Sequence, residues 1–145
     1  MTTFVAPGEA VCIYHGVDNA KTTIPQEFRD SAWVVRAHVV SADYHWADSG
    51  DSWTRYRLRV ERSYKGHLPR YFTFFTMRDS GGFYMDGDNG SPDFNDYLLF
   101  LDGRPWRTSA AAKVSVWVNY NCGQSGSWAK LTAKQQAQLE ALARP

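Results

Sequence analysis

Three aspartates in a glycine-rich stretch are the nearest approach in this sequence to a metal site. Asp86, Asp88 and Asp93 provide carboxylate oxygens of the kind that calcium prefers. An EF-hand counted from Asp86 would also need an oxygen ligand at position 5, glycine at position 6 and glutamate at position 12, where this chain has glycine, serine and tyrosine. The EF-hand template therefore fails. A calcium site of another type and a plain polar turn remain open, and we favour the turn.

The histidines do not form a zinc motif. His15, His38, His45 and His67 lack the short pair spacing of zinc ligands, and only two cysteines are present to help them. A hydrogen-bonded structural role is the usual one for a histidine within a strand, which is where His38 falls. We therefore expect neither a metal nor a cofactor.

No pattern in the chain marks a catalytic centre. Cys12 and His15 could suggest a thiol and its base, but three residues of separation in an irregular segment carry no catalytic geometry. The sequence has no Gly-x-Ser-x-Gly elbow, no phosphate-binding glycine loop and no His-Glu-x-x-His motif. Its four glutamates are scattered, without the pairing of a glycosidase. We predict that the protein is not an enzyme.

The two cysteines, Cys12 and Cys122, lie near opposite ends of the chain. A bond between them would close a loop long enough to stabilise the fold by about 4–5 kcal/mol on the loop-entropy estimate. We predict this disulfide and an exported, periplasmic or secreted protein; two reduced thiols in a cytosolic protein are the alternative. The first residues have no basic and apolar regions of a signal peptide, so we expect a leader to be absent from this sequence.

A row of arginines is the clearest candidate binding feature. Arg55, Arg57 and Arg59 alternate with apolar residues, so a strand would place all three guanidinium groups on one face. Such a face could dock an acidic partner or a phosphate backbone. Alternatively, the aspartate-rich segment 79–102 neutralises it, or it is simply solvated. The net charge of +1 argues against nucleic acid.

Three aromatic residues fall in or beside the glycine-rich segment 79–94. Phe83, Tyr84 and Phe94 in an exposed loop would suit the anchors of a protein interface. Packing of these rings back onto the domain is the alternative.

Length and composition indicate one globular domain over residues 1–145. Hydrophobic residues make up 43% and charged residues 21%, which excludes a disordered chain. No apolar run approaches the roughly 20 residues of a membrane helix. Aromatic residues reach 15%, which favours strands.

Apolar runs and alternation predict five strands, at 33–40, 53–60, 71–77, 97–101 and 114–120. A short helix at 22–29 with Thr23 as its cap precedes them. A second helix at about 131–143 follows, with Thr132-Ala-Lys-Gln135 as a capping box. Strands with helices only at the ends predict a mainly β fold, a five-stranded OB-like closed barrel with its core at about 31–122.

The order of these elements resembles the tissue-inhibitor-of-metalloproteinases/netrin-like family. The matching segments are Ser31–Val40, a strand ending at Lys65-Gly66, Asp96–Leu101 and a late cysteine in Asn121–Gly123. The resemblance covers about residues 12–128. It implies an OB-type barrel with terminal helices in an exported protein.

The inhibitory motif of that family does not carry over. Animal members begin the mature chain with Cys-x-Cys, whereas here eleven residues precede Cys12 and position 14 is Tyr14. We therefore expect a non-catalytic exported module that binds a protein and inhibits or neutralises a hydrolase or toxin. The alternative is an OB-type barrel that binds oligosaccharide or single-stranded nucleic acid on the Arg55, Arg57 and Arg59 face. The sequence does not indicate an oligomeric state.

Overall fold

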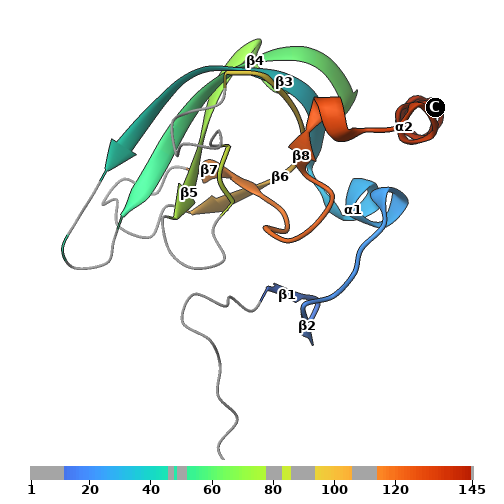
Figure 1. The fold of residues 1–145 in the computed structure, drawn as a ribbon, viewed down its shortest axis with the longest axis horizontal. Coiled ribbons are helices and arrows are strands. Elements are labelled where there is room, and N and C mark those ends of the chain that lie inside the picture. The colour runs from blue at the N-terminus through green and yellow to red at the C-terminus, as the bar shows by residue number, and fades with distance from the viewer. Residues whose placement is uncertain are drawn as a thin grey trace, which may run out of the picture.

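A computed structural model describes residues 12–45, 48, 52–77, 83–85, 94–105 and 114–144. Figure 1 shows a strongly curved sheet with both helices lying to one side of it. The elements in chain order are β1 (Ile13–Tyr14), β2 (Val17–Asp18), α1 (Ile24–Asp30), β3 (Trp33–His45), β4 (Trp53–Lys65), β5 (Tyr71–Met77), β6 (Asp96–Pro105), β7 (Val114–Val118), β8 (Gly126–Ser127), η1 (Trp128–Lys130) and α2 (Ala133–Ala143).

Five of these strands close into a barrel. Their order is β3-β4-β5-β7-β6, and β6 pairs back with β3 to complete the ring. All neighbouring pairs are antiparallel except β5 and β7, which pair in parallel. The predicted mainly β fold, an OB-like closed five-stranded barrel with a short N-terminal and a C-terminal helix, is confirmed. No helix among the described residues is both long and apolar enough to cross a membrane.

Alternation along β4 separates the inside of the barrel from the outside, as the sequence predicts. Tyr56 and Leu58 are fully buried, whereas Arg55 and Arg57, which alternate with them, are exposed. Burying a large apolar side chain is favourable by about 1.5–3 kcal/mol, so the arrangement with the apolar residues inside is strongly preferred over a register slipped by one residue. The buried residues of the barrel core are Val35, Ala37, Val39, Tyr56, Leu58, Leu68, Phe72, Phe74, Phe83, Met85, Tyr97, Leu99, Leu101 and Val118.

The strands β3 and β4 are longer than predicted, at 13 residues each. Their pairing shifts register at three places, one of them between Arg36 and Ala37. Such bulges bend and twist a strand, which lets a long pair wrap around a barrel. The shift also changes the phase of β4, because Arg59 lies opposite His38 whereas Arg62, three residues later, lies opposite Arg36. Arg62 therefore joins the outward-facing arginines.

Both helices begin where the sequence predicts. The Thr23 hydroxyl accepts a hydrogen bond from the Gln26 amide, and Thr132 and Gln135 form the reciprocal capping box. The helices cover a second apolar cluster on the outer side of the barrel, in which Leu139 of α2 is fully buried. This packing holds α2 against the sheet.

A small hairpin of β1 and β2 precedes α1, in a segment that the sequence suggested to be irregular. His15 and Gly16 at its tip have φ angles of 49° and 80°, the left-handed values that a tight turn requires. The predicted disulfide between Cys12 and Cys122 is confirmed and joins this hairpin to the chain after β7, with the two Cα atoms 6.0 Å apart. Cys12 packs there with Tyr14 and Tyr120.

A buried carboxyl group joins α1 to the chain beyond the disulfide. Glu27 is fully buried, and its Oε2 accepts hydrogen bonds from the Thr22 hydroxyl at 2.5 Å and the Gln124 amide at 2.6 Å. Burial raises the pKa of Glu27 because the charged form loses its hydration. A Cβ at Gly123 would collide with this carboxyl group, which explains glycine at that position.

Candidate binding surface

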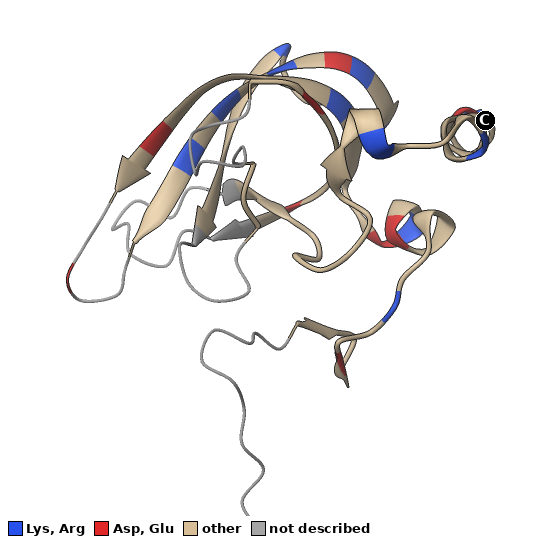
Figure 2. Ribbon diagram, viewed as in Figure 1, with Lys and Arg blue, Asp and Glu red and all other residues tan. Residues whose placement is uncertain are grey.

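The three predicted arginines lie together on the outer side of the barrel. Arg55, Arg57 and Arg59 of β4 pair across the strands with Phe75, Thr73 and Tyr71 of β5. Figure 2 shows the basic positions of β4 beside an acidic position near the end of β3. We call the outward surface that carries Arg55, Arg57, Arg59, Arg70 and Tyr71 the arginine face.

Two of these arginines are paired with carboxylates. Arg55 donates from Nη2 to Oδ2 of Asp43 on β3, and Arg59 donates from Nε to Oε1 of Glu61 on β4, both at 2.8 Å. These pairs are solvent-exposed, so each contributes at most about 1 kcal/mol to the fold. An incoming partner can therefore compete for these guanidinium groups at small cost.

Within the described residues of the acidic segment 79–102, neither Asp96 nor Asp102 pairs with the arginine face. Asp96 instead bonds Arg36 at 2.8 Å and His38 at 2.7 Å. These bonds lower the pKa of Asp96 against the opposing effect of burial. His38 is thus a hydrogen-bonded structural histidine, as predicted for a residue within a strand.

Two guanidinium groups of the arginine face lie against an exposed tyrosine ring. Tyr71 is 44% exposed, and the Cζ atoms of Arg57 and Arg70 lie 5.3 and 5.9 Å from the centroid of its ring. Neither arginine has a carboxylate partner within the part of the chain that the structure describes. Contact with the ring restricts the positions of the guanidinium groups without occupying their N–H donors with a carboxylate.

A row of aromatic rings borders the arginine face. The sequence patterns did not predict this row. The ring centroids of His45 and Trp53 are 4.7 Å apart, those of Trp53 and Phe75 are 5.5 Å apart, and those of Phe75 and Trp117 are 6.4 Å apart. The four rings belong to β3, β4, β5 and β7 in turn. The only sequence signal was that Trp53 shares the phase of Arg55.

The three loop aromatics have different environments. Phe83 is a member of the barrel core and only 8% exposed. It therefore packs onto the domain, which was the alternative to an interface anchor. Tyr84 and Phe94 are 38% and 52% exposed, so they keep surface that a partner could contact. Asp86, Asp88 and Asp93, the candidate calcium ligands, lie outside the described residues.

Metal-binding side chains do not gather elsewhere in the described part of the chain. No group of three histidine, cysteine, aspartate or glutamate side chains there could hold an ion. His15 bonds Asp30 at 3.2 Å, and His45 stacks on Trp53.

Neither protein-family models nor curated protein sequences gave a match to this chain. The resemblance to the tissue-inhibitor-of-metalloproteinases/netrin-like family therefore rests on the sequence motifs and stays a prediction.

Proposed function

We propose that this protein is a non-catalytic binding module that holds an acidic segment of a partner protein on its arginine face. The observation that carries the proposal is the exposed Tyr71 with Arg57 and Arg70 against its ring, two guanidinium groups without a carboxylate partner among the described residues. Tyrosine and arginine are enriched among the residues that contribute most to protein interfaces. A partner carboxylate could accept two parallel N–H bonds from one guanidinium group.

The charges on this face favour an acidic protein segment over a nucleic acid. Asp43 and Glu61 pair with Arg55 and Arg59, on either side of Arg57. A phosphate backbone that ran along β4 would approach both carboxylates, whereas a short acidic segment needs only the central guanidinium groups. The net charge of +1 also provides little general attraction for a polyanion.

As the partner we propose an exported hydrolase or toxin, which this protein inhibits or neutralises. The Cys12–Cys122 disulfide supports a periplasmic or secreted location, because disulfides persist in oxidising compartments. The class of partner follows from the family resemblance, which we carry forward as part of the proposal.

The test is affinity capture from envelope and secreted fractions of the host, with three forms of the protein. Arg57→Glu/Arg70→Glu reverses the two central charges, and Lys130→Glu/Lys134→Glu makes the same charge change near and on α2. The wild type and the lysine variant should each recover one stoichiometric protein, and the arginine variant should lose it. Equal recovery by all three forms would contradict this use of the arginine face.

A second candidate function is supported by the aromatic row. Rings from β3 to β7 beside guanidinium groups resemble the stacking surfaces on which OB-type barrels hold single-stranded nucleic acid or oligosaccharide. Titration with a short oligonucleotide at two salt concentrations distinguishes the two. Binding that weakens steeply with salt and is lost in Trp53→Ala would favour this candidate.

A further inference from the structure

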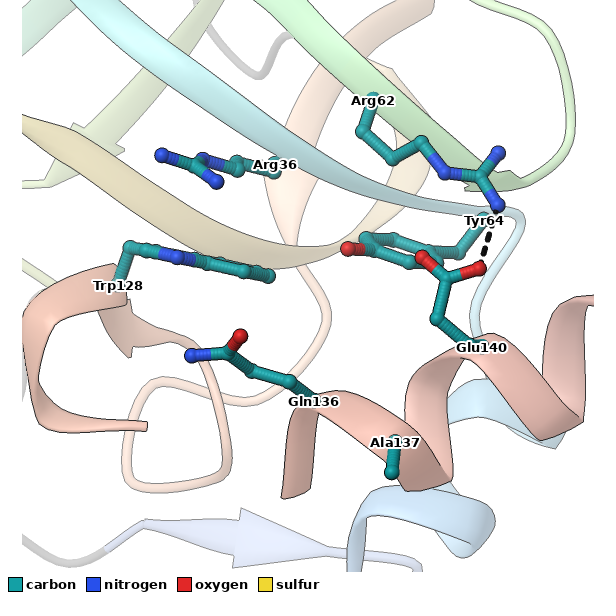
Figure 3. Close-up of a pocket in the computed structure, with 7 residues that line it drawn as sticks. All are labelled: Arg36, Arg62, Tyr64, Trp128, Gln136, Ala137 and Glu140. Atoms are coloured by element: carbon teal, nitrogen blue, oxygen red, sulfur yellow. Dashed lines mark hydrogen bonds and ion pairs between the residues drawn. The ribbon is translucent and has the colours of Figure 1, made fainter. Parts of the chain in front are cut away.

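A pocket of about 370 Å³ lies between α2 and the outer surface of the barrel, away from the arginine face (Figure 3). Tyr64 of β4 and Trp128 of η1 form one wall. Their ring planes differ by 13° and their centroids are 6.4 Å apart, and Figure 3 shows the rings side by side. Gln136, Ala137 and Glu140 of α2 form the facing wall. The pocket thus combines an apolar ring platform with polar side chains on a helix.

Each ring has a guanidinium group over one face only. The Cζ atom of Arg36 is 4.4 Å from the Trp128 ring centroid, and that of Arg62 is 4.9 Å from the Tyr64 centroid. Figure 3 shows both groups on the side of the rings away from Gln136. The pocket lies on the other side of the rings, toward α2. Trp128 is half-buried, whereas Tyr64 is only 8% exposed, so Trp128 provides most of the ring surface that a ligand can contact.

The charges around the pocket are balanced in pairs. Arg62 donates from Nη2 to Glu140 Oε2 at 2.9 Å, and Arg36 donates from Nε to Asp96 Oδ2 at 2.8 Å. Because each guanidinium charge is already balanced by a carboxylate, little net charge is left to attract an anion, and a cation would meet two guanidinium groups. The pocket is therefore suited to an uncharged ligand.

The polar groups that remain can bind hydroxyl groups. The Gln136 amide can both donate and accept, and the terminal nitrogens of Arg36 have no hydrogen-bond acceptor within the described part of the chain. A purely apolar ligand would remove these groups from water without replacing their hydrogen bonds. A pyranose ring matches the pocket, since it has an apolar C–H face for the aromatic platform and hydroxyl groups around its edge.

We infer that this pocket is a binding site for a sugar unit of an uncharged oligosaccharide. The volume is at the lower end of the range for small-molecule sites, which limits the occupant to a small ligand or the end of a chain. The site is separate from the arginine face and does not depend on the function proposed for it.

The test is NMR titration of the ¹⁵N-labelled protein with maltotriose, cellotriose and N,N′,N″-triacetylchitotriose. The indole N–H signal of Trp128 is assigned by its loss in Trp128→Phe. We expect this signal to shift saturably with at least one trisaccharide at millimolar concentration. Gln136→Ala should weaken the binding by about fivefold, the effect of one lost hydrogen bond. Lys134→Ala, on the same helix but outside the pocket, should leave it unchanged.

Two results would overturn the inference. One is a failure of the sugar test, in which no sugar moves the Trp128 signal or the shift is equally weakened by Gln136→Ala and Lys134→Ala. The other is a saturable shift with inorganic phosphate and not with the sugars, which would show that the site takes an anion. Arg57→Glu/Arg70→Glu should bind the sugar as the wild type does, so the outcome is independent of the arginine face.

Discussion

Removal of the disulfide should destabilise this protein more than any single surface change. The bond joins residues separated by 110 positions, and the loop-entropy relation assigns about 4.7 kcal/mol to a loop of about 100 residues. Noncovalent contacts hold the folded structure at this site without the bond, since Tyr120 donates to the Ala20 carbonyl at 2.9 Å and the Cys12 amide donates to Asn19 Oδ1 at 3.1 Å. The cost then arises in the unfolded chain, which gains conformational freedom.

The assay is denaturant unfolding of the wild type and of Cys12→Ala/Cys122→Ala in buffer without reductant. The free energy of unfolding should fall by about 4–5 kcal/mol, with a decrease in Tm of about 15 °C for a chain of this length. The dependence on denaturant should become steeper, because an uncrosslinked unfolded chain exposes more surface. Cys122 is exposed, so the wild type treated with reductant should match the double variant.

A loss below about 1 kcal/mol with an unchanged denaturant slope would refute this reasoning. That result would mean that the crosslink does not restrict the unfolded chain as assumed. Two free thiols in protein from the native host, counted by alkylation and intact mass, would contradict the exported location.

Three further predictions test the packing and the buried ionisable groups. The pKa of Glu27 is raised above 4.5 in the folded state, so the folded protein binds that proton more tightly. The free energy of unfolding should therefore fall as the pH rises from about 4.5 through the folded pKa. Glu27→Gln keeps an acceptor for Thr22 and Gln124, so it should remove this pH dependence of the free energy of unfolding, measured by denaturant unfolding at several pH values. If the variant keeps the pH profile of the wild type, Glu27 is not the group responsible. Leu139→Ala should lower the free energy of unfolding by about 2–5 kcal/mol, because it leaves a cavity at a fully buried site of α2. A loss under about 1 kcal/mol, close to the value of one buried methylene group, would show that the packing of this helix contributes little to stability. Burial and the hydrogen bond to an aspartate raise the pKa of Tyr14 to about 12. Ultraviolet titration should therefore show one tyrosine that ionises near pH 12 in the wild type and is missing in Tyr14→Phe. If Tyr14→Phe instead loses a tyrosine that ionises near the usual pKa of about 10, the docking of the hairpin is contradicted.

Local patterns predicted most of the elements correctly. Alternation from Trp53 to Val60 identified the buried and exposed faces of β4, because a strand directs successive side chains to opposite sides. The Thr132–Gln135 spacing identified the start of α2, because a capping box is complete within four residues. The distance between the two cysteines along the chain favoured their pairing but did not require it.

The tertiary structure decided everything that depends on strand pairing and bulges. The aromatic row brings together rings from four strands, and the sugar pocket combines β3, β4, η1 and α2. Phe83 lies in the core although its glycine-rich surroundings suggested an exposed loop.

The sequence by itself therefore determined the five barrel strands, the helix starts and the common face of Arg55, Arg57 and Arg59, because those features depend on neighbours a few residues away. Only the folded barrel determined that Arg57 and Arg70 both lie against the Tyr71 ring and that Arg36 and Arg62 lie over the rings of the pocket. The physical reason is that register across the strands, shifted by the bulges in β3 and β4, sets which distant side chains meet.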